Sequence, residues 1–378
     1  MATAEKTKGG LEDVVATSSA ICYLDGERGV LAYCGYDIHD LAKHATFEEV
    51  CYLLWHRRLP NRAELGDLQS QMAASRALPE PILRLMRSLP PVDGMDAIRT
   101  LTSALAHYDR EADDTAPQVQ YRKAVRLTAQ IGTIVATWGR MQAGGGPIAP
   151  DPAMGHAASF LYMLTGERPN PMAIRAFDIA LTLHADHELN ASTFAGRVAA
   201  ATLTDIYSAV VAAIGTLKGP LHGGANEEVM HMLNEIGSMD KVESYIKDKL
   251  QRKERVMGFG HRVYKAHDPR ATYLKTFSKQ VAADTGNEKL YDMSRRIEEI
   301  MGKEVAAKGI YANVDFYSAT TYYSLGLDID LFTPMFAMSR IAGWAGHCIE
   351  QLNDNKLIRP HVEYTGPHNV KYVPIDQR

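Results

Sequence analysis

Apolar residues recur every three or four positions along most of this chain, which is the spacing of amphipathic helices. Two of these helices have clear start signals. The sequence Thr46-Phe-Glu-Glu49 is a capping box that opens a helix, and Pro60 stops it. Asn61-Arg-Ala-Glu64 begins the next helix in the same way. The pattern therefore predicts a chain that is mostly helical.

Segments rich in glycine and proline, such as 144–152, 166–169 and 219–220, separate the remaining helices. The stretch 192–216 is apolar, with Ala-rich and Val-rich faces, and is expected to form one long helix, either central or at a subunit interface. The further helices are expected at residues 95–110, 120–141, 152–165, 171–188, 224–236, 270–284, 288–308 and 334–352.

Only residues 21–36 have a clear β pattern. Two β-rich runs flank Asp25-Gly26 and Gly29, which indicates a hairpin. The sequence lacks the alternation of strands and helices that would build a parallel sheet. It also lacks a repeat of twenty to fifty residues, which a solenoid would require. The expected fold class is therefore all-α with a short N-terminal β-hairpin.

Composition narrows the functional classes. The chain has 378 residues, 46% of them hydrophobic, and a formal charge of −4 that argues against a nucleic-acid protein. The four cysteines, Cys22, Cys34, Cys51 and Cys348, form no CxxC pair and are expected to be reduced thiols. No apolar stretch is long enough to span a bilayer, and the N-terminus has no signal-peptide pattern. We expect a soluble cytoplasmic protein.

Several of the fourteen histidines lie in glycine-rich junctions. Four clusters carry the candidate chemistry: HADHELN (184–190), GPLHGGANEE (219–228), MGFGHRVYKAHDPR (257–270) and NVDFYSA (313–319).

His222 follows Gly219-Pro220 and precedes Gly223-Gly224, where the backbone can approach a ligand closely. It is either an acid, base or hydrogen-bond donor, or a capping histidine in an ordinary turn, and this motif alone favours neither.

The run from Gly258 to His261 fails the GxGxxG test for a nucleotide loop, because Val263 stands at the third glycine position. The positive charges of residues 262–270 indicate binding of carboxylates or phosphates. The alternatives are a solvated basic turn and an Asp268 that only caps the next helix.

His184 and His187 are three residues apart on a predicted helix, so they are expected to share a face. A zinc site is the less favoured interpretation, because HExxH is absent and every cysteine is isolated. A substrate-binding or core histidine is favoured.

Asp315 lies between Val314 and Phe316, near the start of a predicted helix. A carboxylate partly removed from water has a raised pKa, which suits a general base. A simple helix N-cap is the alternative, and the residue alone favours it.

In this order and spacing, GPLHGGANEE, GFGHRVYKAHDPR and NVDFYSA resemble the citrate synthase family, and the likeness runs over essentially the whole chain. The resemblance implies a two-domain helical homodimer. The large domain would comprise residues 1–222 and 323–378, with a small domain at 223–322 inserted. The chain resembles the shorter bacterial and archaeal type, without an extra N-terminal β domain.

The resemblance also implies the site residues. The catalytic residues would be His222, His261 and Asp315. The oxaloacetate ligands would be His187, Arg270, Arg340 and Arg359, with Arg359 reaching the partner's site from a tail that Pro360 keeps from being helical. The coenzyme A contacts would be Arg255, Val256, Met257, Gly258 and Phe259, with Lys265, Arg262 and Lys308 at the phosphates.

The reaction implied is condensation of acetyl-CoA with oxaloacetate, followed by hydrolysis of citryl-CoA, with no metal or redox cofactor. The close alternative is 2-methylcitrate synthase, which uses propionyl-CoA, because one methylene is worth only about 1–3 kcal/mol in an apolar pocket. A metallohydrolase using His184 and His187, or a catalytically inactive helical scaffold, is a further alternative. The scaffold is disfavoured because all seven catalytic and oxaloacetate residues are present.

Overall fold

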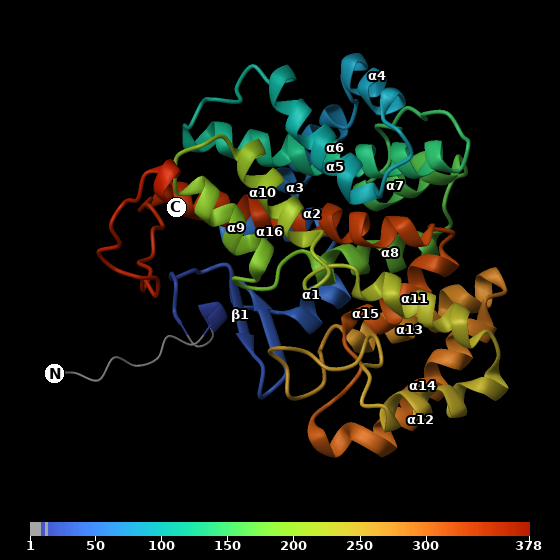
Figure 1. Ribbon diagram of the computed structural model, residues 1–378. Helices are drawn as coiled ribbons and strands as arrows, with labels where there is room; N and C mark the ends of the chain where they lie inside the picture. Colours follow the sequence, from blue (N-terminus) through green and yellow to red (C-terminus); the bar gives the residue numbers. More distant parts are fainter. Residues whose placement is uncertain (1–8, 12–13) are drawn as a thin grey trace.

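The computed structural model describes residues 9–11 and 14–378, and nearly all of its regular structure is helical (Figure 1). The predicted all-α class with an N-terminal hairpin is confirmed. The α-helices are α1 (Ile38–His44), α2 (Phe47–His56), α3 (Arg62–Ser75), α4 (Glu80–Ser88), α5 (Gly94–Leu105), α6 (Pro117–Gln142), α7 (His156–Thr165), α8 (Pro171–His184), α9 (Ala191–Ala200), α10 (Ile206–Leu217), α11 (Ala225–Ile236), α12 (Val242–Gln251), α13 (Ala271–Thr285), α14 (Glu288–Val305), α15 (Val314–Ser324) and α16 (Phe332–Asn353). The short 3-10 helices are η1 (Gly9–Leu11), η2 (Ala106–Tyr108), η3 (Met239–Lys241), η4 (Ala306–Lys308), η5 (Ile329–Leu331) and η6 (Ile375–Gln377).

Both expected capping boxes are present. Thr46 and Glu49 cap α2, and Asn61 and Glu64 cap α3, with side chain and backbone bonded in both directions. Each pair satisfies backbone N–H groups that the first turn leaves unpaired, so these two helices begin where the sequence predicts.

The hairpin is the first part of a three-stranded antiparallel sheet of β1 (Cys22–Asp25), β2 (Val30–Tyr33) and β3 (Tyr36–Asp37). Asp25 pairs with Val30, so residues 26–29 form the turn. Tyr33 is fully buried, and its hydroxyl donates to the carbonyl of Asp186 at 2.9 Å. The base of the hairpin is thereby fixed to the loop after α8.

Helix α16 runs through the middle of the molecule (red in Figure 1) and packs on α2, α5, α6, α8, α9, α10 and α11. Two glycines allow this close packing. A Cβ atom on Gly343 would lie 2.4 Å from the Ala185 carbonyl oxygen, and one on Gly346 would lie 2.9 Å from that of Leu54. Because α16 contacts elements from both halves of the chain, its side chains can order segments that are distant in sequence.

Three expected helices are wrong in extent. The helix expected at 152–165 begins only at His156, because residues 152–154 form a turn and Gly155 precedes the helix. The stretch 192–216 is broken into α9 and α10, since Leu203 has a left-handed φ of 67° and Asp205 caps α10. The helix expected at 171–188 ends at His184. Arg340 donates to the His184 carbonyl and Gly343 to the Ala185 carbonyl, so α16 satisfies the helix end.

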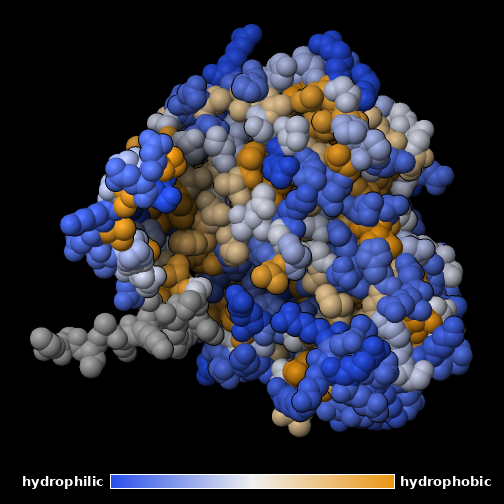
Figure 2. Space-filling model, viewed as in Figure 1, coloured by the Kyte–Doolittle hydropathy of each residue, from blue (hydrophilic) through white to orange (hydrophobic). Residues whose placement is uncertain are grey.

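Helices α11 to α15 gather at the lower right of Figure 1, where α13 and α11 pack on α15 and α12 packs on α14. They cover the segment predicted as the small domain, 223–322. Figure 2 shows mostly hydrophilic side chains over the lower right of the molecule and a hollow lined by apolar side chains beside the C-terminal segment. Within the described residues, every helix is too short or too polar to cross a bilayer.

Candidate functional site

The loop that carries His261 is tied to the loop that leads to Asp315. Phe259 and Ala312 form an isolated antiparallel bridge, and Gly260 N donates to the Tyr311 carbonyl at 2.9 Å. Asn313 donates from its backbone to the Gly258 carbonyl and from its side chain to the Gly260 carbonyl, both at 2.9 Å. Two of the four sequence clusters therefore form one structural unit.

Asp315 lies in the first turn of α15 and is not its N-cap. Asn313 caps the helix by accepting from the Asp315 backbone N–H at 3.0 Å, so the simple N-cap interpretation of Asp315 is wrong. Burial raises the pKa of the Asp315 carboxyl to about 6, with Arg270 and Arg340 opposing that rise. The carboxylate is free of the capping task and is more basic than an exposed aspartate.

Arg270 is buried and its charge is balanced by buried Asp268. Arg270 Nε and Nη2 lie 2.9 and 2.8 Å from the two Asp268 oxygens, and Asp268 also accepts from Val314 N at 3.0 Å. Burial alone would raise the pKa of Asp268, but Arg270 holds it below its usual value. Asp268 is therefore more than a helix cap, because it fixes Arg270 beside the helix that carries Asp315.

His187 lies beyond the end of α8, so the prediction that it shares a helix face with His184 is wrong. Its Nε2 is 3.2 Å from the Tyr264 hydroxyl, and its ring centroid is 5.2 Å from that of His261. His184 is fully buried on α8 with Nδ1 donating to the Ala180 carbonyl at 2.8 Å. The two histidines therefore contact different partners. No group of three metal-ligating side chains occurs within residues 9–11 and 14–378.

His222 lies in the turn between α10 and α11, where Gly223 leaves room for the Leu217 carbonyl. Ser192 N donates to His222 Nε2 at 3.2 Å, and the Ser192 hydroxyl lies 2.8 Å from the same nitrogen. A backbone N–H can only donate, so Nε2 is unprotonated and the ring proton is on Nδ1. His222 thus holds a donor for a ligand.

His261 has the opposite tautomer. Its Nδ1 accepts from the backbone N–H groups of Val263 and Tyr264 at 3.0 and 3.2 Å, which leaves the proton on Nε2. Burial lowers the pKa of His222 and of His261 to about 4. The positive charge of Arg340 adds to this effect at His222, and that of Arg270 adds to it at His261. Burial also lowers the pKa of His187 well below its usual value. All three rings are neutral at pH 7.

Arg340 is 1% exposed on α16. Its Nε donates to the His184 carbonyl at 2.7 Å, and its guanidinium lies 4.7 Å from the Phe336 ring centroid. Across the described part of the chain, no carboxylate lies within ion-pair distance of Arg340. Burial lowers its pKa. Asp186 offsets this charge only from beyond ion-pair distance, and a buried cation without a direct partner favours an anionic ligand.

Most of the predicted coenzyme A residues follow α12, in the loop that carries His261, and Lys308 lies on η4. Val256 and Gly258 are buried and Met257 and Phe259 are half-buried, whereas the basic side chains Arg255, Arg262, Lys265 and Lys308 are exposed. Gly309 lies against the Lys265 carbonyl, at 3.0 Å from the position of a Cβ atom, so Lys308 and Lys265 belong to neighbouring segments. The structure thus places exposed positive charge beside this loop.

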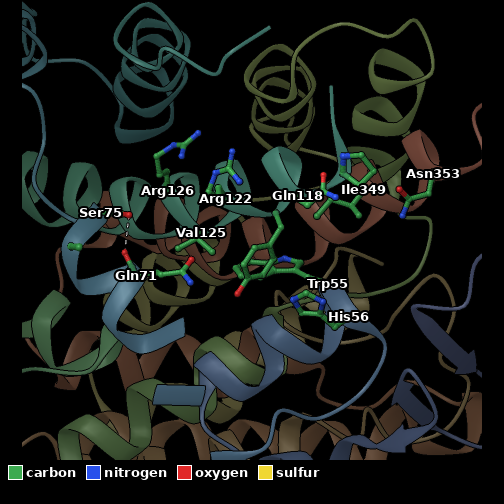
Figure 3. Close-up of a pocket in the computed structure, with 13 residues that line it drawn as sticks. Trp55, His56, Gln71, Ser75, Gln118, Arg122, Val125, Arg126, Ile349 and Asn353 are labelled. Carbon is green, nitrogen blue, oxygen red and sulfur yellow. Dashed lines mark hydrogen bonds between the residues drawn. The ribbon is translucent and has the colours of Figure 1, made fainter. Parts of the chain in front are cut away.

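Arg359 lies apart from the other predicted oxaloacetate ligands. It is exposed beyond α16 and lines a separate cavity of about 1190 Å³ with Arg197 and Glu350. A further cavity, of about 750 Å³, contains no predicted site residue (Figure 3). Trp55, His56 and Tyr121 form its aromatic part, and Arg122 and Arg126, which line it too, are paired with the acids Glu111 and Asp109.

Sequence reasoning missed three site residues: Tyr264, Ser192 and Trp344. Tyr264 contacts His187, Ser192 contacts His222, and Trp344 Nε1 donates to the Ser192 hydroxyl at 3.2 Å. Tyr264 lies inside a quoted cluster and Ser192 two residues beyond one. Nothing in the sequence pattern indicated Trp344, whose position depends on how α16 packs.

The fold and the site together define a helical protein with a buried site of arginines, neutral histidines and a carboxyl group of raised pKa. Comparison with known proteins gives the family. The family model for the C-terminal domain of citrate synthase matches residues 10–361. Citrate synthase 2 of Bacillus subtilis is 53% identical over 98% of this chain and 98% of its own length. Citrate synthase of Haloferax volcanii is 49% identical over 98% of this chain and 99% of its own length.

Solved structures agree. Citrate synthase from Pyrobaculum aerophilum superposes with a TM-score of 0.92 at 41% identity, covering 98% of this chain and 95% of that one. A ternary complex of carboxymethyl coenzyme A and oxaloacetate with citrate synthase from Thermoplasma acidophilum gives a TM-score of 0.92 at 34% identity, covering 98% of both chains. The chain belongs to the citrate synthase family, and the predicted family is confirmed.

The hairpin turn supports the His261 loop, and this contact can be tested. Gly26 O accepts from Lys265 N at 2.9 Å, and a Cβ atom at Gly26 would lie 2.3 Å from the Val263 carbonyl oxygen. Gly26→Ala should displace the loop and lower the free energy of unfolding by about 1–3 kcal/mol. The His261 Cε1–H resonance in NMR spectra should shift. Gly66→Ala, in open space on α3, is the control and should leave that resonance unchanged. An unperturbed resonance in Gly26→Ala would contradict the support role.

Proposed function

We propose that this chain condenses acetyl-CoA with oxaloacetate to citryl-CoA and hydrolyses it to citrate and coenzyme A. One observation carries the proposal. Buried Arg270, which Asp268 fixes beside the helix of Asp315, and buried Arg340, which has no direct ion-pair partner among the residues that the structure describes, lie near the same carboxyl group. The same arginines lie near three neutral histidines. This arrangement suits a small dianion held beside an acid–base centre.

Oxaloacetate would be bound by His187 and the arginines. Each guanidinium presents a planar fork of donors that matches a carboxylate. Arg270 uses its Nε–Nη2 edge for Asp268, so its other edge would serve the ligand. Arg340 would gain the anionic partner that balances its buried charge. The Thermoplasma relative, whose structure is described as holding oxaloacetate and a coenzyme A analogue, supports this choice of ligands.

The carbon–carbon bond requires a base for the weakly acidic methyl group of acetyl-CoA. Asp315 would remove that proton, and His222 Nδ1–H would donate to the thioester oxygen as negative charge develops there. His261 Nε2–H would donate to the ketone oxygen of oxaloacetate as the new bond forms. Both donors are neutral imidazoles with the required tautomer. The reaction as written requires no metal or redox cofactor.

Coenzyme A would lie along residues 255–259, with its phosphates near Lys265, Arg262 and Lys308. Citrate is favoured over 2-methylcitrate because the relatives at 46–53% identity are named citrate synthase. The relative named citrate/2-methylcitrate synthase, from Bacillus subtilis, is 41% identical.

The site would be completed by a second copy of the chain. Arg359 is exposed on the C-terminal segment, which also exposes apolar side chains such as Val362 and Tyr364. Such a segment suits burial on another subunit. The large domain, 1–222 and 323–378, would form the dimer, and 223–322 would be the small domain. Four free cysteines suit a reducing compartment, and the cytoplasm is the expected location.

A thiol-release assay tests the proposed activity. Coenzyme A should be released from acetyl-CoA only when oxaloacetate is present, and release from propionyl-CoA should be slower by about tenfold or more. Faster turnover of propionyl-CoA would establish 2-methylcitrate synthesis instead. No release from either substrate would contradict the proposal.

The same assay tests the base. Asp315→Asn should lower kcat by about a hundredfold to ten-thousandfold while oxaloacetate still binds, because an amide of the same shape cannot take the proton. In the unmodified protein, kcat/KM for acetyl-CoA should fall as pH drops below about 6, because the raised pKa of Asp315 lets the base protonate there. A flat profile through pH 6 would contradict this assignment.

Mixed dimers test the shared site. Asp315→Ala and Arg359→Ala should each be nearly inactive alone. After co-refolding, half of randomly paired dimers are mixed, and each has one repaired site of two. Activity should therefore return to roughly a quarter of the unmodified level. If Arg359 acts within its own subunit, no activity returns.

A further inference from the structure

A second buried polar cluster joins α16 and α9 to the loop that carries His187. Asp186, Arg197 and His347 are 0%, 3% and 1% exposed. His347 Nε2 lies 3.3 and 3.4 Å from the two Asp186 carboxylate oxygens, and Arg197 Nη1 lies 3.2 Å from His347 Nδ1. None of these three side chains has a role in the proposed reaction, yet Asp186 directly precedes His187.

The hydrogen bonds fix the tautomer of His347. A guanidinium can only donate, so His347 Nδ1 accepts from Arg197 and the ring proton lies on Nε2, aimed at Asp186. Arg197 is itself held by Glu350 Oε2 at 2.7 Å and by Gln351 Oε1 at 3.0 and 3.1 Å. His347 is therefore oriented from one side and donates to a buried carboxylate on the other.

The Asp186 side chain also fixes the backbone of Glu188, the residue that follows His187. Its Oδ2 accepts from Glu188 N at 3.2 Å, and Glu188 has a left-handed φ of 55°. A non-glycine residue in this conformation is strained and persists only where its surroundings hold it. A strained turn thus lies directly after the predicted oxaloacetate ligand.

The carboxylate has little room to move. A Cβ atom at Gly343 would lie 2.3 Å from Asp186 Oδ1, so α16 closes over this side chain. The Tyr33 hydroxyl donates to the Asp186 carbonyl at 2.9 Å. The backbone of Asp186 is thus fixed by β2, and its side chain is fixed by α16. The hydrogen bond from His347 gives the buried carboxylate a donor.

We propose that His347 is a positioning residue for the oxaloacetate site. Its Nε2–H holds Asp186, Asp186 holds the strained turn at Glu188, and the turn sets the direction of the His187 imidazole. This inference rests on the proposed function, because it assigns His187 to oxaloacetate. Loss of the His347 donor should weaken oxaloacetate binding while the acid–base groups stay in place.

Two amide substitutions isolate this donor. His347→Gln places an amide N–H near the position of Nε2, within reach of Asp186. His347→Asn is too short to reach Asp186 and leaves its oxygen near the position of Nδ1, where it still accepts from Arg197. We expect His347→Asn to raise the KM and the calorimetric Kd for oxaloacetate by about tenfold to a hundredfold. We expect kcat at saturating oxaloacetate to change less than about threefold, because uniform binding is lost. His347→Gln should stay within about threefold of the unmodified protein in all these quantities.

His156→Leu is the control for loss of a buried histidine. His156 is 3% exposed on α7, in contact with Phe47. This variant should lower the thermal midpoint without changing the oxaloacetate Kd. Equal oxaloacetate affinity in His347→Asn and the unmodified protein, or equal losses in His347→Asn and His347→Gln, would overturn the proposal.

Amide hydrogen exchange separates this proposal from the proposed function. The Glu188 amide should exchange faster in His347→Asn than in His347→Gln or the unmodified protein, whatever reaction the chain catalyses. If that difference is found but oxaloacetate does not bind the unmodified protein, the proposed function fails and the positioning chain stands. If oxaloacetate binds and the Glu188 amide is unaffected in His347→Asn, the positioning chain fails.

Discussion

The charge of Arg340 is the constraint on which the rest of the site depends. Placing a guanidinium inside a protein costs several kcal/mol unless other groups compensate. Its protein partners are a carbonyl oxygen and an aromatic ring, which compensate only in part. Arg270 is balanced by Asp268, and the nearby histidines are held neutral by burial and by the two arginines. Within the described ranges of the chain, Arg340 therefore remains without a direct ion-pair partner, which suits the anion proposed to bind there.

The same helix that carries Arg340 orders the loops around it. Along α16, Ser339 contacts the Leu181 carbonyl, Gly343 donates to Ala185 and Trp344 donates to Ser192. These contacts hold the segment from the end of α8 to the start of α9. That segment contains His187 and, through Ser192, sets the tautomer of His222. One helix thus connects Arg340, the proposed anion ligand, with the tautomer of His222, the proposed proton donor.

Much of the fold and site could be predicted because local chemistry determines it. The capping boxes at Thr46 and Asn61 act within one turn, so those helix starts were right. The break between α9 and α10 was missed because the apolar spacing continues across it, although Asp205 was a readable cap. The end of α8 was missed because its carbonyls are satisfied from α16, which local sequence does not encode. His347 was missed for the same reason, since its partners lie some 150 and 161 residues away.

Calorimetry of oxaloacetate binding to the unmodified protein and to Arg340→Gln tests the central claim most directly. Glutamine keeps a polar side chain but removes the positive charge and the forked donors. The account predicts that the unmodified protein binds oxaloacetate without acetyl-CoA and that Arg340→Gln weakens this binding by about a hundredfold or more, at an unchanged or higher thermal midpoint, because the buried charge is gone. Equal affinity of the two proteins for oxaloacetate would contradict it.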